Sequence, residues 1–187
     1  MHNNILTQSK IFDGVWISRA EINHDRRGTT YEWFNSTVRP KGFEDIEITQ
    51  LLTSVSKKNV IRGMHFSIRN NPQYKLIKCT DGKILDIVID LRMESATFGK
   101  FDLFELDSVT ADTIMISEGF GHGYQVLSNR AIVDYALQTN FKFEEEHVIN
   151  PYDPRLKLPW KGKHHILSDR DRSAENFDTF FNNNNNP

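Results

Sequence analysis

Short segments rich in β-branched and aromatic residues recur along most of the chain, and residues typical of turns separate them. Such segments are typical of β-strands, and few stretches have the pattern of a helix. The predicted strands are residues 14–20, 59–66, 74–79, 83–91, 100–106, 112–117, 123–128 and 131–137. Many short strands joined by turns favour an antiparallel sandwich or barrel.

Turn and helix signals refine this architecture. Asp81-Gly82 predicts a tight hairpin between two of the strands, because Asp-Gly suits the positive φ angles of such a turn. Only residues 168–178 and 143–149 have the character of helices. We therefore predict an all-β protein, a cupin-type jelly-roll antiparallel barrel with a few short helices, mainly near the C-terminus.

The segment 83–91 indicates that the barrel interior is partly polar. Strict alternation places Leu85, Ile87, Ile89 and Leu91 on one face of the strand. The other face carries Asp86, Val88 and Asp90. Small barrels can hold one ligand inside, and polar side chains borne on strands are suited to that purpose.

Composition and charge narrow the function. The 187 residues fit one domain, predicted as residues 1–180, followed by a low-complexity polar tail, residues 181–187, without a functional role. The net charge of −2 with interspersed signs argues against nucleic acid or a membrane as partner and favours a small charged metabolite. Cys79 is the only cysteine, which excludes an intramolecular disulfide. The single cysteine and the absence of a leader-like or membrane-spanning apolar run together predict a cytoplasmic location.

Three ionisable residues interrupt strands that otherwise look buried: Arg62, His65 and Lys75. An unpaired ionisable group in a core costs several kcal/mol, so each needs a partner or a purpose. His65 can be a hydrogen-bonded core histidine with Lys75 reaching the surface, or a neutral general base with a cation beside it. Alternation places Arg62 and His65 on opposite faces, unless a bulge at Gly63 turns both inward.

The glycine-rich stretch 116–128 contains Gly119, Gly121 and Gly123. It lacks the Lys-Ser/Thr and the strand-to-helix context of a phosphate-binding loop. Its Gly-x-x-His spacing is similar to a metal-binding motif of cupins, but the His-x-His pair of the other motif is missing, since Ser67 follows His65 at that spacing. A divalent metal would lack ligands, and we predict neither a metal nor another cofactor.

Two further residues allow both a structural and a catalytic interpretation. Tyr135 alternates with Val133 and Leu137, so it is either a core aromatic with a bonded hydroxyl or a proton donor facing His65 across the cavity. Asp171 lies near the start of a predicted helix, where its charge would complement the helix dipole.

Taken together, these motifs resemble the dTDP-4-dehydrorhamnose 3,5-epimerase family of RmlC-like cupins, from about Gly14 to about Ala174. The ordered set is far more specific than any one member. The matching stretches are "DRRGTTYE", "VIRGMH", "YKL", "DIVIDLR" with "SATFGKF", "ISEGFGHGY", "VDYALQTNF", "YDP" and "ILSDRD".

This resemblance implies epimerisation of a nucleotide-diphosphate-linked 4-keto-6-deoxy sugar at carbon 3, carbon 5 or both, through an enolate. His65 would be the base, Asp171 its orienting carboxylate, Tyr135 the proton donor and Lys75 the cation that stabilises the enolate oxygen. Substrate-binding positions fall on Arg27, Glu32, Gln50, Arg62, His122, Phe141, Glu146 and Arg170. The resemblance further implies a dTDP-linked substrate and a homodimer that exchanges N-terminal strands.

Departures from the family pattern surround the expected nucleotide and sugar sites. The family's Gln-x-Asn reads Gln50-Leu51-Leu52, and Phe141 replaces the usual tyrosine, while Thr29, Thr30 and Ala136 stand where aromatic residues and a lysine are usual. The sequence therefore leaves the nucleotide and the sugar open. Alternatives are a sugar-nucleotide 3,4-ketoisomerase, a metal-dependent cupin oxygenase and a non-catalytic sugar-binding cupin. The first is disfavoured by Phe66 and Ser67 in place of a second histidine, and the second by the missing ligands.

Overall fold

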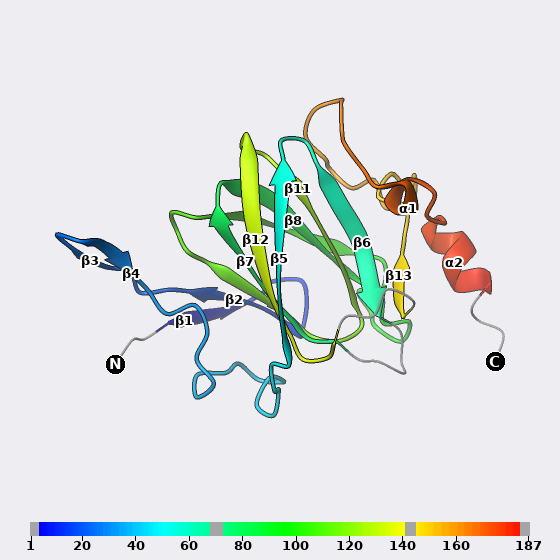
Figure 1. Ribbon diagram of the computed structural model, residues 1–187. Helices are drawn as coiled ribbons and strands as arrows, with labels where there is room; N and C mark the ends of the chain where they lie inside the picture. Colours follow the sequence, from blue (N-terminus) through cyan, green and yellow to red (C-terminus); the bar gives the residue numbers. More distant parts are fainter. Residues whose placement is uncertain (1–3, 68–72, 141–144, 184–187) are drawn as a thin grey trace.

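The computed structural model describes residues 4–67, 73–140 and 145–183, and two antiparallel sheets dominate it (Figure 1). All strand pairs within these sheets are antiparallel. The six-stranded sheet has the order β1 (Ile5–Gln8), β2 (Val15–Arg19), β10 (Thr113–Ile116), β7 (Lys75–Asp81), β12 (Arg130–Leu137) and β5 (Gln50–Lys57).

The five-stranded sheet faces the first and completes the jelly-roll. Its order is β13 (Glu146–Val148), β6 (Ile61–Ser67), β11 (Phe120–Val126), β8 (Lys83–Asp90) and β9 (Phe101–Asp107). A separate hairpin consists of β3 (Asn23–Asp25) and β4 (Gly28–Thr30), and the helices are α1 (Asp169–Arg172) and α2 (Phe177–Asn183). The predicted all-β jelly-roll with short C-terminal helices is confirmed.

The predicted hairpin at Asp81-Gly82 is wrong, because β7 and β8 belong to different sheets. Gly82 instead lies where the chain crosses from one sheet to the other. It has φ 79°, and a Cβ there would lie 2.1 Å from the carbonyl oxygen of Arg130. The glycine is therefore required by both the backbone angle and the close approach.

The two predicted helices also differ from the structure. Residues 141–144 lie outside the described residues, but the rest of the predicted helix 143–149 contains strand β13, whose pairing with β6 replaces helical hydrogen bonds. The other prediction, 168–178, divides into α1 and the start of α2. Helix α2 continues through Asn183, so the first residues of the predicted polar tail are helical, and Phe181 packs against Phe177.

The core has three parts that follow from strand alternation. Leu85, Ile87 and Ile89 pack on one face of β8 with the C-terminal segment, including Phe177 of α2. Ile84 and Val88 face the opposite way, into an apolar cluster between the sheets. In a third cluster, Phe43 and Ile46 pack against side chains of the six-stranded sheet. The predicted alternation of β8 is confirmed.

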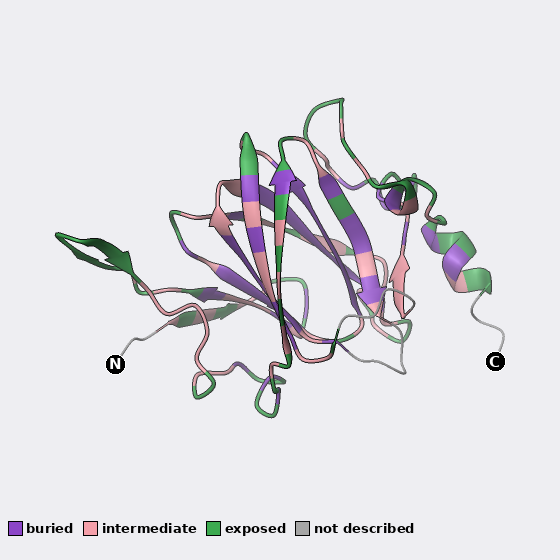
Figure 2. Cartoon of the chain, in the orientation of Figure 1, coloured by how far each residue is buried: buried purple, intermediate pink, exposed green. Residues whose placement is uncertain are grey.

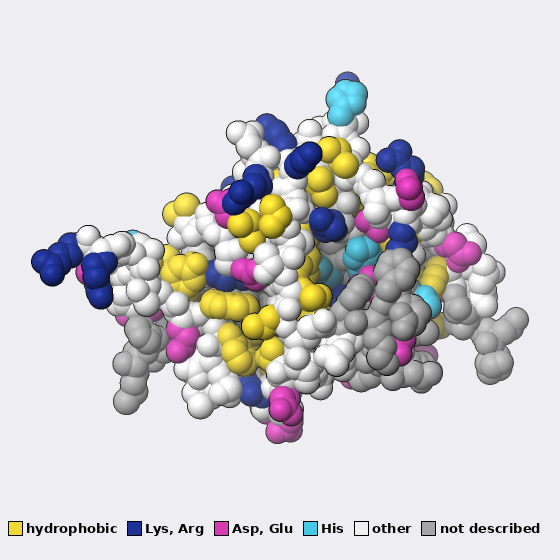
Figure 3. All heavy atoms as spheres, viewed as in Figure 1, with side chains coloured by type: hydrophobic (Ala, Val, Ile, Leu, Met, Phe, Trp, Pro, Cys, Tyr) yellow, Lys and Arg dark blue, Asp and Glu magenta, His cyan; other side chains and the backbone are white. Residues whose placement is uncertain are grey.

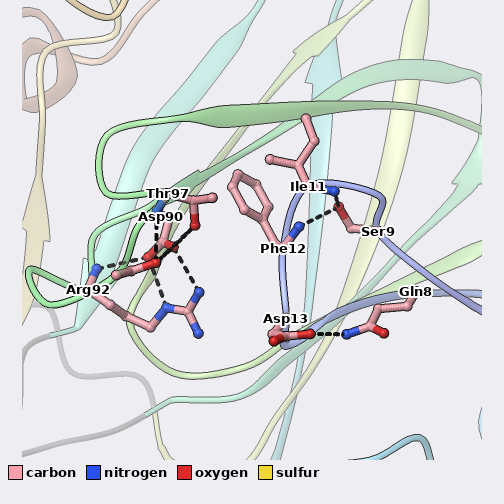
Figure 4. Close-up of polar contacts among 9 residues, drawn as sticks. Gln8, Ser9, Ile11, Phe12, Asp13, Asp90, Arg92 and Thr97 are labelled. Carbon is pink, nitrogen blue, oxygen red and sulfur yellow. Dashed lines mark hydrogen bonds and ion pairs between the residues drawn. The ribbon is translucent and has the colours of Figure 1, made fainter.

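A network of polar contacts follows the end of β8, where the chain leaves the strand (Figure 4). Asp90 is fully buried and accepts bonds from Arg92 Nε and Nη2 at 2.9 and 2.8 Å, from Ser95 Oγ at 2.6 Å and from Thr97 Oγ1 at 2.5 Å. The Arg92 guanidinium also lies 4.3 Å from the ring centroid of Phe120. Residues of "DIVIDLR", "SATFGKF" and "ISEGFGHGY" thus meet in one structural cluster.

Asp90 should make stability depend on pH in the acid range. Burial acts to raise the pKa of Asp90, but the bonds from Arg92, Ser95 and Thr97 outweigh it and lower the pKa to about 2 from the ordinary 3.8. This stabilisation is present above about pH 4 and is lost as the pH falls toward 2, and its size is about 2 kcal/mol. Urea unfolding at pH 7, 4 and 2.5 should show this loss in the wild type and not in Asp90→Asn, which should be less stable at pH 7.

The exposed Asp45→Asn, which makes the same chemical change, serves as the control and should keep the wild-type pH profile. An Asp90→Asn variant as stable as the wild type at pH 7 would contradict the assignment.

The β3–β4 hairpin projects away from the barrel and is exposed over its whole length (Figure 2). Within the part of the chain described here, neither helix has the length and apolar character required to cross a membrane.

Candidate active site

A cavity of about 440 Å³ opens between the two sheets. Figure 3 shows histidine side chains recessed in a hollow with Lys or Arg side chains near it. Its lining comes from both sheets and from the segment around α1, and consists of Leu52, Thr53, Ser54, Arg62, His65, Gln73, Lys75, His122, Tyr135, Leu137, Glu146, Ser168, Arg170 and Asp171.

A bulge in β6 brings Arg62 and His65 to the same cavity. His122 of β11 pairs with His65, but Tyr124 pairs with Arg62, so two residues of β6 stand opposite one of β11. Gly63 has φ 130°, and a Cβ on it would lie 2.5 Å from the Cα of Gly123. The bulge at Gly63 that the sequence allowed is therefore present, and the close approach explains one glycine of the 116–128 stretch.

His65 is oriented by Asp171. The Nε2–Oδ1 distance is 2.8 Å, and the Asp171 side chain is 4% exposed. Since a carboxylate only accepts, Nε2 carries the hydrogen, which leaves the lone pair on Nδ1. The Asp171 backbone N–H donates to the side chain of Ser168, the N-cap of α1. Ser168 thus holds Asp171 in place, and Asp171 in turn orients the imidazole of His65.

Lys75 enters the cavity from the facing sheet rather than from a strand paired with β6. It pairs with Leu137 of β12, two positions from Tyr135, so Lys75 and Tyr135 share the inward face. Burial lowers the pKa of Lys75, and the negative charge of Glu146 opposes that shift. A poorly hydrated ammonium interacts strongly with an oxygen that becomes negative.

Tyr135 is held as a protonated phenol. Burial, and then the neighbouring Tyr124 and the charge of Asp86, raise its pKa well above 10. Its ring lies edge-on to that of His122, with centroids 6.1 Å apart. His122 is buried and donates from Nε2 to Asp86 Oδ2 at 2.7 Å.

Two arginines supply positive charge to the lining. Arg62 donates from Nε to Ser56 Oγ at 3.0 Å, and Ser56 also lies 3.2 Å from the hydroxyl of Tyr124. Arg170 donates from Nη1 to Glu146 Oε2 at 3.1 Å. Both arginines are suited to an anionic ligand.

Three predicted site residues, Arg27, Glu32 and Gln50, do not line this cavity. Gln50 lines a second hollow, of about 380 Å³, with Trp33 and Phe34. Arg27 lies on the β3–β4 hairpin with its side chain 83% exposed and bonded to Asp25. The Glu32 side chain accepts from Asn35 at 2.9 Å. Phe141 lies outside the described residues.

Sequence reasoning missed several lining residues. Leu52 and Ser54 alternate on β5, a strand that the sequence did not predict, and Gln73 and Ser168 lie outside strands. Asp86, the partner of His122, was placed on the polar face of its strand but was given no role. The role of Asp86 depends on the register of β8 against β11, which places Asp86 opposite Tyr124 and is not visible in the sequence.

Among the described residues, no group of three or more His, Cys, Asp and Glu side chains is arranged to hold a metal ion. The two histidines of the cavity each bond a different carboxylate, His65 to Asp171 and His122 to Asp86.

Comparison with known proteins identifies the family. The family profile of dTDP-4-dehydrorhamnose 3,5-epimerase matches residues 9–179. The dTDP-4-dehydrorhamnose 3,5-epimerase of Mycobacterium tuberculosis is 34% identical over 169 residues, which cover 88% of this chain and 84% of the relative.

Two solved structures share the fold closely. One is NovW, a 4-keto-6-deoxy sugar epimerase from the novobiocin biosynthetic gene cluster of Streptomyces spheroides, with a TM-score of 0.90 and 30% identity over 97% of this chain and 91% of NovW. The other is ChmJ, a 3'-monoepimerase from Streptomyces bikiniensis in complex with dTDP-quinovose, with a TM-score of 0.86 and 28% identity over 94% of this chain and 89% of ChmJ. The chain therefore belongs to the dTDP-4-dehydrorhamnose 3,5-epimerase family of sugar-nucleotide isomerases.

Proposed function

We propose that the protein epimerises a dTDP-linked 4-keto-6-deoxy sugar, with His65 as base, Lys75 as electrophile and Tyr135 as acid. The observation that carries this assignment is that one cavity is lined by an imidazole with a defined free nitrogen, a buried ammonium and a protonated phenol. The imidazole comes from one sheet, and the ammonium and phenol come from the facing sheet.

The chemistry assigns each group one step. Nδ1 of His65 removes a proton from a carbon next to the ketone, and the electron pair of that C–H bond forms the enolate. The Lys75 ammonium stabilises the negative charge on the enolate oxygen, a contact typically worth about 3–4 kcal/mol. The Tyr135 hydroxyl then gives a proton to the opposite face of the same carbon, which inverts it and restores the ketone.

The remaining lining residues bind the substrate in this proposal. Arg62 and Arg170 carry the charge that a diphosphate requires, and His122, fixed by Asp86, contacts the sugar. The dTDP-sugar complex of ChmJ supports a dTDP-linked substrate for this chain as well. The cytoplasmic location stays a prediction from the sequence.

Incubation with a panel of nucleotide-linked 4-keto-6-deoxy sugars in deuterated water tests the reaction. We expect at least one dTDP-linked sugar to gain deuterium at carbon 3, carbon 5 or both as its epimer forms, read separately by NMR. Binding of these sugars without any deuterium incorporation would favour a non-catalytic sugar-binding protein.

We also propose a homodimer in which the N-terminal region of one subunit completes the site of the other. Arg27 lies on a hairpin that projects from its own barrel (Figure 1), although the family resemblance places it at the nucleotide. Apolar side chains are exposed on strands of the six-stranded sheet, among them Ile5, Leu51 and Val55. A partner subunit would cover such a surface.

Mixed dimers test this arrangement. Arg27→Ala alone should weaken dTDP binding about tenfold, because a charge-assisted bond is lost. Consider a dimer of one Arg27→Ala subunit and one His65→Asn subunit, in which each site combines His65 of one subunit with Arg27 of the other. One site then contains both substitutions and the other contains neither, so about half of the wild-type activity should return. Activity no higher than that of the separate variants would show that Arg27 does not act on its partner.

A further inference from the structure

Glu146 and Arg170 form an ion pair in the cavity. Arg170 Nη1 donates to Glu146 Oε2 at 3.1 Å, and Arg170 Nη2 donates to the backbone carbonyl oxygen of Glu146. The Glu146 side chain is only 9% exposed. The guanidinium that is suited to the substrate diphosphate therefore already holds an anion that belongs to the protein.

The same carboxylate faces the free nitrogen of His65. Glu146 Oε2 lies 3.9 Å from His65 Nδ1, the atom left with the lone pair because Nε2 bonds Asp171. Glu146 and Asp171 are the two acidic residues among the described residues that line the cavity. Asp171 bonds the Nε2 side of the imidazole, so of these two carboxylates Glu146 is the one on the Nδ1 side.

The charge of Glu146 also acts on Lys75. Burial lowers the pKa of Lys75, and the negative charge of Glu146 opposes this shift. The same carboxylate thus bonds Arg170 and acts electrostatically on Lys75. A diphosphate brought next to Arg170 would meet a like charge as long as Glu146 stayed there.

We propose that Glu146 is an internal counterion of Arg170, that the substrate diphosphate displaces it from this arginine, and that the displacement uncovers Nδ1 of His65. The inference rests on the proposed function, since it concerns the same base and the same anion site. Glu146 lies on the edge strand β13, and Ile149 just beyond it exchanges backbone bonds with Met64, so we place the displacement in the side chain of Glu146 and not in the strand. Binding of the anion and exposure of the base would then be one event.

The proposal predicts the opposite sign from a role of Glu146 as a substrate ligand. Glu146→Gln keeps the length of the side chain and can still accept from Arg170, but it removes the charge that competes with an anion. Inorganic diphosphate should bind Glu146→Gln about three- to tenfold more tightly than wild type in titration calorimetry, and dTDP should follow the same direction. Weaker or unchanged binding of diphosphate would overturn the proposal.

Glu145→Gln is the matched control, since it makes the same change in net charge one residue away, at a position that does not line the cavity. It should leave the affinity for diphosphate unchanged. If Glu145→Gln raised this affinity as much as Glu146→Gln does, the effect would come from the overall charge of the protein. A crystal structure of the wild-type protein with inorganic diphosphate provides a test without any variant. We expect Arg170 on the diphosphate and Glu146 Oε2 beyond hydrogen-bond distance of it, whereas an intact pair would overturn displacement.

These measurements use no turnover, so they separate the two proposals. Absence of solvent exchange with every sugar of the panel would reject the epimerase assignment, whereas the diphosphate titrations would still decide whether Glu146 competes with an anion. Conversely, active enzyme with unchanged affinity in Glu146→Gln would reject only the counterion role.

Discussion

Replacing His65 by asparagine should reduce deuterium exchange at every epimerised carbon by about 10²- to 10⁴-fold, the usual contribution of a general base. Asparagine has no basic nitrogen, and its shorter side chain ends near the position of the imidazole Nδ1, so the 2.8 Å contact of His65 Nε2 with Asp171 Oδ1 is lost as well. Affinity for dTDP should stay within about twofold, because the proposed anchors of the diphosphate are arginines. NMR in deuterated water measures exchange, and calorimetry measures binding.

His164→Asn, at an exposed position, provides the control for the loss of a histidine and should behave as wild type. If His65→Asn exchanged substrate protons at the wild-type rate, His65 would be only the hydrogen-bonded core histidine that the sequence also allowed. The cavity would then need another base, and Glu146, 3.9 Å from His65 Nδ1, would be the nearest carboxylate on that side of the imidazole.

Strand alternation predicted most of the fold because the buried faces are nearly continuous. Segment 83–91 became β8, with Leu85 and Ile87 on one face and Val88 on the other, as its period required. Strand β5 escaped prediction because its inward face carries Leu52, Ser54 and Ser56, which are not typical of a buried strand. Those small polar residues are there because this face borders the cavity and the Tyr124 hydroxyl.

Local signals failed where distant contacts decide the structure. Asp81-Gly82 has the sequence of a hairpin turn, but the strands on either side pair with other strands, so Gly82 serves a crossing between sheets. Residues 145–149 carry helix-forming glutamates, yet Glu146–Val148 pair with β6. In both cases tertiary pairing outweighed local preference.

The ordered motifs predicted the cavity better than any single residue did. Arg62, His65, Lys75 and Tyr135 lie on three strands from two sheets, and no spacing rule relates them. The pairing of His122 with Asp86 needed the register of β11 on β8, which the sequence does not show. Arg27 is exposed in the single chain, whereas Glu32 is half-buried and bonded to Asn35, and the role of both stays a prediction.

Replacing Tyr135 by phenylalanine should separate exchange from inversion. If His65 removes the proton and Tyr135 supplies one to the opposite face, the variant still forms the enolate, since His65 and Lys75 are unchanged. It should then reprotonate mostly from the original face, so deuterium enters the unepimerised substrate faster than epimer appears. Epimer formation should fall by about 10²- to 10⁴-fold, the range for loss of a general acid, whereas wild type couples exchange more closely to inversion.

The raised pKa of Tyr135 makes this test informative. Burial first, and then the nearby Tyr124 and Asp86, keep the phenol protonated, so the wild type holds a proton to give and phenylalanine does not. The ring keeps its packing, so a gross folding defect is not expected. Tyr152→Phe is the matched control: its hydroxyl bonds His165 Nδ1 at 2.8 Å and the residue does not line the cavity, so its loss should leave the ratio of exchange to inversion unchanged. If Tyr135→Phe kept both the wild-type ratio and the wild-type turnover, Tyr135 would be a core aromatic, and a bound water would be the next acid to test.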